Sequence, residues 1–230
     1  MRNAFVVTLL ILIAGNGVHA EAVLEVPMKS HNFGSLPKNC MLTHSFWLKS
    51  IGDDTVSIDE IKTGCSCAIT RMESDRMAPG DSLEMEIEWD ISKYRSSLSR
   101  SIRIFYNGRT KPLRISMKGQ VVQQPDSLRP ISVSPFRFEL ASTTQKSIDS
   151  IGFVMTNHTD RDLSLRNISG DFDQCVVILP SIVPAMSTAT GYIRLNPEYV
   201  DQEFQTSMTI SVDNLRKTNF TIPIRRKFYH

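Results

Sequence analysis

"SLEMEIEW", residues Ser82 to Trp89, alternates apolar and acidic side chains without a break. Successive side chains of an extended strand point to opposite faces, so the apolar residues would share one face and the glutamates the other. In a helix the two classes would be mixed around the circumference. The stretch therefore predicts a β-strand with one face buried and the other in water.

Short alternating runs of this kind fill most of the chain. Residues 42–48, 102–106 and 113–117 repeat the pattern, and Asn107-Gly108 separates the last two runs with a pair typical of a hairpin turn. Many short strands with closely spaced turn signals are typical of an antiparallel sandwich rather than a parallel sheet. We therefore expect an all-β protein built from immunoglobulin-like antiparallel β-sandwiches.

The second half of the chain repeats the first. "FWLKSIGDDTVSIDEI" (Phe46–Ile61) aligns without a gap on "FVMTNHTDRDLSLRNI" (Phe153–Ile168), at an offset of 107 residues. Each copy then reaches a cysteine, with Cys67 matched to Cys175 after one extra residue, followed by a proline turn and another alternating run. Duplicated features in one order predict two tandem domains. We place them at residues 21–123 and 124–230, joined by a short connector within residues 122–130.

Residues 1–20 have the features of a signal peptide. Arg2 precedes the apolar run Phe5–Ala14, and Val18-His19-Ala20 offers small residues before a cut at Glu21. The apolar run is too short to span a bilayer. We expect an exported protein, periplasmic or secreted, with no stable membrane insertion.

Charge is nearly balanced, with 26 Lys+Arg against 24 Asp+Glu. Nucleic acids and anionic membrane surfaces are bound through dense basic clusters. Neither half of the chain is charged enough to suggest such binding, and Arg225-Arg226-Lys227 is interpreted as a solvated end, so we expect no nucleic-acid partner.

The first half carries a set of motifs in the order of a known family. They are Asn32-Phe33-Gly34, Phe46 with Gly52-Asp53, Gly64-Cys65-Ser66-Cys67, and Ala78-Pro79-Gly80. On these motifs the segment from Val26 to Val121 resembles the bacterial exported domain-of-unknown-function family 1573, which is related to the ASH/hydin and major sperm protein domains. The resemblance implies an immunoglobulin-like fold and export, but no activity. The second half is similar to a diverged copy that has lost the first cysteine.

Four cysteines follow the signal segment: Cys40, Cys65, Cys67 and Cys175. Export favours disulfides. In a regular strand Cys65 and Cys67 would lie about 6.6 Å apart, at ~3.3 Å per residue, with side chains too far apart to bridge. Cys40 is then the candidate partner for one of them. Alternatively, Cys67 and Cys175 are small apolar residues of the core. Cys40, Phe46 and Cys175 are our candidate structural residues.

Cys65 and Cys67 are also candidate metal ligands. Two thiolates on one face could bind a soft ion such as Cu(I), with Met72 or Met77 adding a thioether. A structural zinc site would need two more ligands, and the Cys-x-x-Cys spacing of thiol-redox proteins is absent. A periplasmic metal or thiol handling protein is therefore the alternative function, and otherwise no cofactor is expected.

No motif for catalysis occurs: the sequence lacks a nucleophile elbow, a phosphate-binding glycine loop and an HExxH helix. His44 falls on the apolar face of residues 42–48, as a core histidine would. We expect a non-catalytic protein that binds or scaffolds an unknown protein partner in the cell envelope. Candidate contacts are an edge strand or the loops at residues 72–80 and 91–100. Met72, Met77, Pro79 and Gly80 are the named binding-loop residues.

Overall fold

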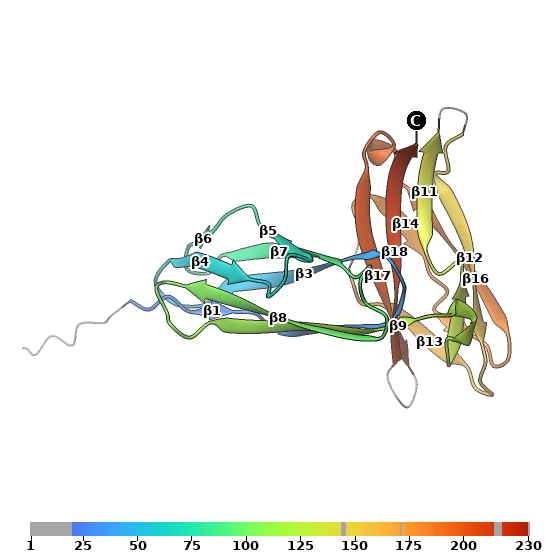
Figure 1. Cartoon of the computed structure of the whole chain (residues 1–230), viewed down its shortest axis with the longest axis horizontal. Coiled ribbons are helices and arrows are strands. Elements are labelled where there is room, and N and C mark those ends of the chain that lie inside the picture. The colour runs from blue at the N-terminus through green and yellow to red at the C-terminus, as the bar shows by residue number, and fades with distance from the viewer. Residues whose placement is uncertain (1–19, 144–145, 171, 214–217, 230) are drawn as a thin grey trace, which may run out of the picture.

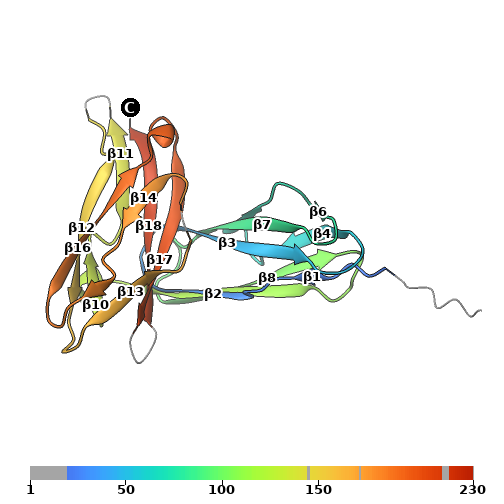
Figure 2. The same cartoon turned by 180° about the vertical axis from the view of Figure 1, so that it is seen from behind.

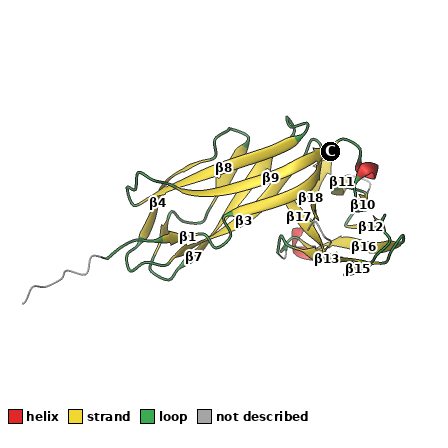
Figure 3. Ribbon diagram, turned by 90° about the horizontal axis from the view of Figure 1, so that it is seen from below, coloured by secondary structure: helices red, strands yellow, loops and turns green. Residues whose placement is uncertain are grey.

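The computed structural model describes residues 20–143, 146–170, 172–213 and 218–229. The signal peptide predicted at residues 1–20 lies outside these residues except for its last position. Regular structure in the described part is β-strand apart from two short 3-10 helices, as Figure 3 shows. None of the described helices is long and apolar enough to cross a bilayer. The prediction of an all-β fold is confirmed.

The strands of the first half run in order from Leu24 to Val122 and end at the first 3-10 helix. They are β1 (Leu24–Glu25), β2 (Ser30–Pro37), β3 (Met41–Ser50), β4 (Val56–Lys62), β5 (Ala68–Arg71), β6 (Arg76–Met77), β7 (Ser82–Asp90), β8 (Ser97–Tyr106), β9 (Leu113–Val122) and the 3-10 helix η1 (Pro125–Ser127).

The strands of the second half start after η1. They are β10 (Ile131–Ser134), β11 (Phe138–Thr143), β12 (Ser150–Asn157), β13 (Leu163–Asn167), β14 (Cys175–Ile178), β15 (Ile182–Val183), β16 (Thr188–Leu195), the 3-10 helix η2 (Pro197–Tyr199), β17 (Phe204–Asp213) and β18 (Thr218–Tyr229).

Both halves use the same strand order. In the first half, one sheet runs β1-β3-β7-β5 and the facing strands run β6-β4-β8-β9-β2. The second half repeats this as β10-β12-β16-β14 and β15-β13-β17-β18, with β11 beside β18. Each half has its own hydrophobic core, drawn from both of its sheets. The match supports the predicted duplication, while the domain limits at residues 123 and 124 stay a prediction.

The alternation that predicts the fold is realised in β7. Met85, Ile87 and Trp89 are almost completely buried in the first core, whereas the intervening glutamates are more exposed. Complete burial of one large apolar side chain stabilises a fold by about 1.5–3 kcal/mol. A register shift of one residue would turn this whole set toward water, so the pattern fixes the register.

The two halves are joined through a shared sheet. β18 of the second half pairs in parallel with β2 of the first, with Phe220 opposite Ser35. Strands of the first half run across those of the second and meet them at this point (Figures 1 and 2). The halves are therefore linked by backbone pairing in addition to the connector around η1.

Gly34 makes this close approach possible. Its φ is +68°, and a Cβ at this position would lie 1.9 Å from the carbonyl oxygen of Asn219. The pairing of β2 with β9 shifts register between Asn32 and Gly34, which marks a bulge. Only glycine fits the approach of β18 at this bulge.

Buried polar contacts complete the junction. Thr221 Oγ1 donates to the Phe33 carbonyl at 2.6 Å and lies 2.8 Å from Thr209 Oγ1. His31 Nε2 is 3.1 Å from the same Thr209 hydroxyl, and the His31 ring stacks on His44 with centroids 3.6 Å apart. Buried hydroxyl and imidazole groups with partners fix one arrangement of their surroundings.

Candidate functional site

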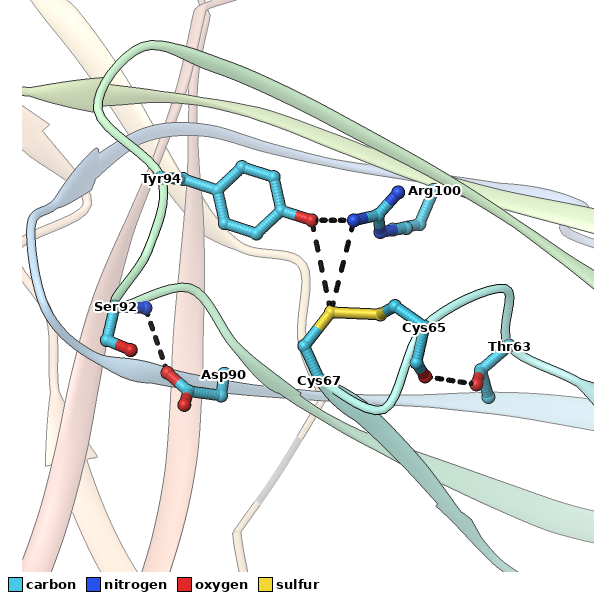
Figure 4. The surroundings of a disulfide bond; sticks show 7 residues. All are labelled: Thr63, Cys65, Cys67, Asp90, Ser92, Tyr94 and Arg100. Atoms are coloured by element: carbon cyan, nitrogen blue, oxygen red, sulfur yellow. Dashed lines mark hydrogen bonds between the residues drawn. A yellow bond between two sulfur atoms is a disulfide. The ribbon is translucent and has the colours of Figure 1, made fainter.

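Cys65 and Cys67 form a disulfide with each other in a turn between β4 and β5 (Figure 4). The expectation that these residues lie in a regular strand is wrong, because β5 begins only at Ala68. Gly64, with φ +77°, redirects the chain before the turn, and the two Cα atoms are 5.2 Å apart. This separation lies well within the range of native disulfides. The bridge that strand geometry excludes is therefore formed in a turn.

The turn also changes which residue of the first repeat corresponds to Cys175. Ala68 lies opposite Trp89, and Cys175 lies opposite Leu195, at the same place in the second sheet. Ala68 and Cys175 are both buried, whereas Cys67 is half-buried and Ile69 is exposed. Cys175 thus corresponds to Ala68, not to Cys67. Cys67, expected as a core residue, is half-buried at the margin of the core, whereas the core position of Cys175 is as expected.

Cys67 is the sulfur that meets polar groups. Its Sγ lies 3.9 Å from Tyr94 Oη and 4.0 Å from Arg100 Nη2. Arg100 Nη2 also donates a hydrogen bond to Tyr94 Oη, so the two groups and the sulfur form one cluster (Figure 4). The Tyr94 ring packs edge-on against Trp89 of the core, with centroids 5.7 Å apart. The core thus holds the tyrosine in place against the disulfide.

Arg100 carries a positive charge that is not matched by a nearby carboxylate. It forms none of the ion pairs found in the described part of the chain. Its Nε is buried, and it has no hydrogen-bond partner among the described residues. Arg100 projects from β8 on the same side as the buried Leu98 and Ile102. The guanidinium is therefore directed toward the interior edge where the disulfide lies.

The other two cysteines are free thiols. Cys40 donates to the Pro37 carbonyl at 3.3 Å, and the expected Cys40 bridge is not formed, because Cys65 and Cys67 pair with each other. Burial raises the pKa of both Cys40 and Cys175 to about 12. Thiols with such pKa values are poor nucleophiles at neutral pH. Phe46, the third candidate structural residue, is buried in the first core.

The candidate metal ligands do not gather around an open position. In the disulfide, the sulfurs of Cys65 and Cys67 are bonded to each other, so they could act as thiolate ligands only after reduction. Met72 packs on the first core and Met77 is buried within it. Among the described residues no three His, Cys, Asp or Glu side chains are grouped as a metal site requires.

The candidate binding-loop residues divide into two classes. Pro79 and Gly80 are exposed in the turn between β6 and β7. Met77, in contrast, lies in β6 and is buried, so it cannot contact a partner. The expectation that Met77 belongs to a binding loop is wrong, because its side chain fills the core beneath the short β4–β6 pairing. Met72 is half-buried.

The two equivalent edge strands, β5 and β14, differ in chemistry. On β5, Arg71 makes a two-point ion pair with Glu88 of β7. On β14, Val176 and Ile178 are exposed and face outward, opposite the exposed Arg194 and Tyr192 of β16. Charged side chains protect an edge strand from pairing with other chains. The first repeat has that protection at this edge, and the second does not.

The backbone of β14 offers hydrogen bonds on its outer side. Asn196 donates its N–H to the Gln174 carbonyl. This bond shows which residue pairs between β14 and β16 are hydrogen-bonded and which are not. By that alternation Val176 bonds to β16, whereas the N–H and C=O groups of Cys175 and Val177 point away from it. Among the described strands β14 pairs with β16 alone. It is an open edge.

Sequence reasoning missed the buried histidine pair at the junction. His44 is buried, as expected for a core histidine, and it stacks on His31. Burial lowers the pKa of His31 to about 4, and burial together with the neighbouring His31 lowers that of His44 to about 3. Both rings are therefore neutral at physiological pH. The signal was present: both histidines alternate in step with buried apolar residues of their strands.

Comparisons with known proteins identify a family for the first repeat. Residues 24–121 match DUF1573, described as a protein of unknown function, which confirms the resemblance seen in the sequence. No curated protein matches this sequence.

Solved structures show similarity at low identity. They include an ASH / PapD-like domain of human CEP192 (11% identity over 44% of this chain and 86% of that chain, TM-score 0.36) and a protein of unknown function from Porphyromonas gingivalis (8% identity, 89% and 99%, TM-score 0.36). A third is the VesB protease of Vibrio cholerae (11% identity, TM-score 0.35), of which this chain spans 31% while 44% of this chain is covered.

Proposed function

We propose that this protein, whose residues 24–121 belong to the DUF1573 family, is an exported, non-catalytic binding or scaffolding protein of the cell envelope. In this proposal it holds an extended segment of a partner protein along the edge of β14. Export rests on the signal-like residues 1–20 of the sequence. The open edge of β14, a strand without charged side chains of its own, is the observation on which the binding role depends.

The exposed side chains around β14 favour an apolar partner segment. Val176 is 39% exposed, Ile178 45% and Tyr192 46%, and Val154 on the neighbouring β12 is 40% exposed. Ile178 lies directly opposite Tyr192, so these side chains share the outer face of one sheet. Contiguous exposed apolar side chains mark interaction surfaces on soluble proteins.

The backbone geometry favours an extended partner over a helix or a folded surface. An added strand would bond to the outward N–H and C=O groups of Cys175 and Val177. Alternate side chains of that strand would then lie beside Val176 and Ile178 on the outer face. Strand addition of this type obtains affinity from backbone bonds and specificity from the alternate side chains. The occupant is thus a short extended segment with apolar residues at every second position.

The equivalent face of the first repeat shows why β14 is favoured over β5. The positions that correspond to Ile178 and Tyr192 are Arg71 and Glu86. Glu84 and Glu88 add further acidic groups to that face. An apolar strand added at β5 would have to desolvate these charges.

A proline at Val177 tests the proposal. The Val177 N–H points to the open side, so proline removes one donor for an added strand without removing a bond to β16. Val177→Ala is the matched control, because it shortens the side chain and keeps the N–H. Both variants and the wild-type chain serve as bait for envelope proteins of cells that make the protein.

A partner retained by wild type and Val177→Ala but lost with Val177→Pro is the expected result. An identical set of proteins on all three baits would overturn strand addition at β14. Size-exclusion chromatography tests whether the edge binds a second copy of this chain instead. If wild type were dimeric and Val177→Pro monomeric, the proposed partner would be wrong.

A further inference from the structure

We propose that the Cys65–Cys67 disulfide is a thiol–disulfide exchange site that oxidises a pair of cysteine thiols in a partner protein. The site lies in the first repeat, away from β14, and the inference does not depend on strand addition. It adds a stoichiometric redox function, one disulfide delivered per chain, to the proposed binding role.

The first step of the argument is access. Both cysteines are half-buried in a turn, and Ser66 between them is exposed. In contrast, Cys175 is buried, and Cys40, half-buried like the pair, is a free thiol. Disulfide exchange requires that a thiolate reach one sulfur along the S–S axis. Of the four cysteines, only this pair forms a disulfide, and it lies half-buried in a turn beside the exposed Ser66.

The second step is the asymmetry of the two sulfurs. Cys67 Sγ lies against Tyr94 Oη at 3.9 Å and Arg100 Nη2 at 4.0 Å, whereas no such contact is made by Cys65 Sγ (Figure 4). We therefore assign the attack of an incoming thiolate to Cys65, because the electron pair is then left on the sulfur beside Arg100 and Tyr94. Cys67 is the sulfur that leaves.

The third step is stabilisation of the leaving group. A thiolate at Cys67 would face the Arg100 guanidinium, a cation with no carboxylate partner in the described residues, and the Tyr94 hydroxyl could donate to it. A nearby positive charge and a hydrogen-bond donor both favour the ionised form. In Cys-x-x-Cys proteins a helix N-terminus supplies this stabilisation. Here Arg100 and Tyr94 take that part, without a helix.

The exchange balances as two successive displacements. A partner thiolate attacks Cys65 Sγ, a mixed disulfide forms, the Cys65–Cys67 bond breaks, and its electron pair stays on Cys67 as a thiolate beside Arg100. The second partner thiolate then attacks the partner's sulfur in the mixed disulfide and releases Cys65, which takes a proton from water. The partner dithiol loses two electrons and two protons; the Cys65–Cys67 pair gains both electrons and one proton, and the other proton goes to water because Cys67 stays a thiolate.

The second repeat offers an internal contrast. Its turn before β14 has no cysteine, and the cysteine of this repeat, Cys175, is the buried first residue of β14. Burial raises the pKa of that thiol to about 12. The same region of the two repeats thus carries a half-buried disulfide beside a cation in one copy and an inert thiol in the other.

The test uses the mature chain, residues 21–230, in its oxidised form, mixed under anaerobic conditions with a synthetic peptide that contains two cysteines. Mass spectrometry then follows the peptide disulfide. We expect one equivalent of oxidised peptide per chain, and a rate roughly tenfold lower in Arg100→Gln, since the leaving thiolate loses its cation. Arg103→Gln, on the opposite face of the same strand, is the matched control and should react as wild type does.

A second readout separates positioning of the thiolate from a general loss of structure. In reduced Cys65→Ser, Cys67 is the remaining thiol of the pair, and its thiolate absorbance can be titrated with pH. The pKa should lie below the usual value of about 8.5 and rise toward it when Arg100→Gln is added. If Arg100→Gln fails to fold, Tyr94→Phe replaces it and should move the same pKa in the same direction.

Two results would overturn the proposal. One is a wild-type disulfide that transfers nothing to the dithiol peptide under native conditions, which would leave the bridge as a structural link. The other is an equal exchange rate in wild type and Arg100→Gln.

Discussion

The fifth strands of the two repeats, β5 and β14, occupy the same sheet position but differ in the turn before them and in the outward side chain at Arg71 and Ile178. β5 follows a disulfide turn and carries Arg71 paired with Glu88, whereas β14 follows a turn without a disulfide and presents Val176 and Ile178. Their inward positions agree, with Ala68 and Cys175 both buried. The core positions of a duplicated sandwich are thus held by packing, while its edges are able to acquire separate functions.

A second difference concerns β2 and its counterpart β11. Both pair in parallel with the last strand of their own repeat, but β2 has a bulge at Gly34, whereas β11 runs without a register shift. By register, His31 corresponds to Phe138 and Gly34 to Leu140. The residues special to β2 are those that receive β18. One copy has therefore been adapted to hold the other.

The largest effect is expected for Gly34→Val, which puts at the bulge a side chain such as β11 carries. Its Cβ would collide with the Asn219 carbonyl, and φ at this position is +68°. Strain at positive φ and overpacking together should destabilise the fold by about 3 kcal/mol. Urea unfolding measures the loss. Gly152→Val is the control, because a Cβ there has no atom within 4 Å, and a comparable loss in the control would contradict the explanation.

The dependence of stability on pH tests the difference between His31 and Phe138, its counterpart in the second repeat. The pKa of His31 falls from 6.5 in the unfolded chain to about 4 in the folded one, because the ring is buried. As pH falls from 6.5 toward 4, the unfolded state gains a proton that the folded state does not, so the free energy of unfolding should drop by about 3 kcal/mol. Stability above pH 7 should not depend on this group. In His31→Phe, unfolding curves should show a shallower decline, and an unchanged slope would contradict the assignment.

Cys175→Ala makes the second repeat identical to the first at the buried position of the fifth strand. Loss of the sulfur leaves a small cavity beside Leu195, so we expect a loss of about 1 kcal/mol in the free energy of unfolding. Thiol counting adds a check that needs no mutation. Native protein should react slowly with alkylating reagents, and unfolded, unreduced protein should show two thiols per chain, from Cys40 and Cys175. Four would mean that the disulfide is absent.

The smallest effect on stability is expected for Arg71→Ile, which gives β5 the side chain that β14 has at this position. Exposed ion pairs contribute little, so the unfolding curve should not change measurably. Self-association is the informative readout: if charge protects β5, the variant should associate more than wild type in analytical ultracentrifugation. Association equal to that of wild type would mean that β5 is protected by something other than its charge.

The sequence predicts the fold well where one physical pattern dominates. Alternation in residues 82–89 predicted both the strand and its buried face, because apolar residues at every second position indicate a strand with one buried face. The gapless offset of 107 residues anticipated the shared strand order. In these cases neighbours along the chain decide the outcome.

The candidate site could be predicted only in part, since it depends on where a strand begins. Extending the strand through Cys65 and Cys67 excluded their bridge, while the structure starts β5 at Ala68 and leaves both cysteines in a turn. The correspondence of Cys175 with Ala68 needs cross-strand register, which a single sequence does not contain. Arg100 and Tyr94 come from another part of the chain, and nothing local marks them as neighbours of Cys67.

The pairing of β18 with β2 leaves no flexible hinge between the two repeats. Many tandem β-sandwich proteins articulate at a linker, but here Thr221 holds the Phe33 carbonyl and Gly34 admits Asn219 at close range. Bending between the halves would break buried hydrogen bonds. Partners bound at the edge strands β5 and β14 would therefore be held at a fixed distance from each other.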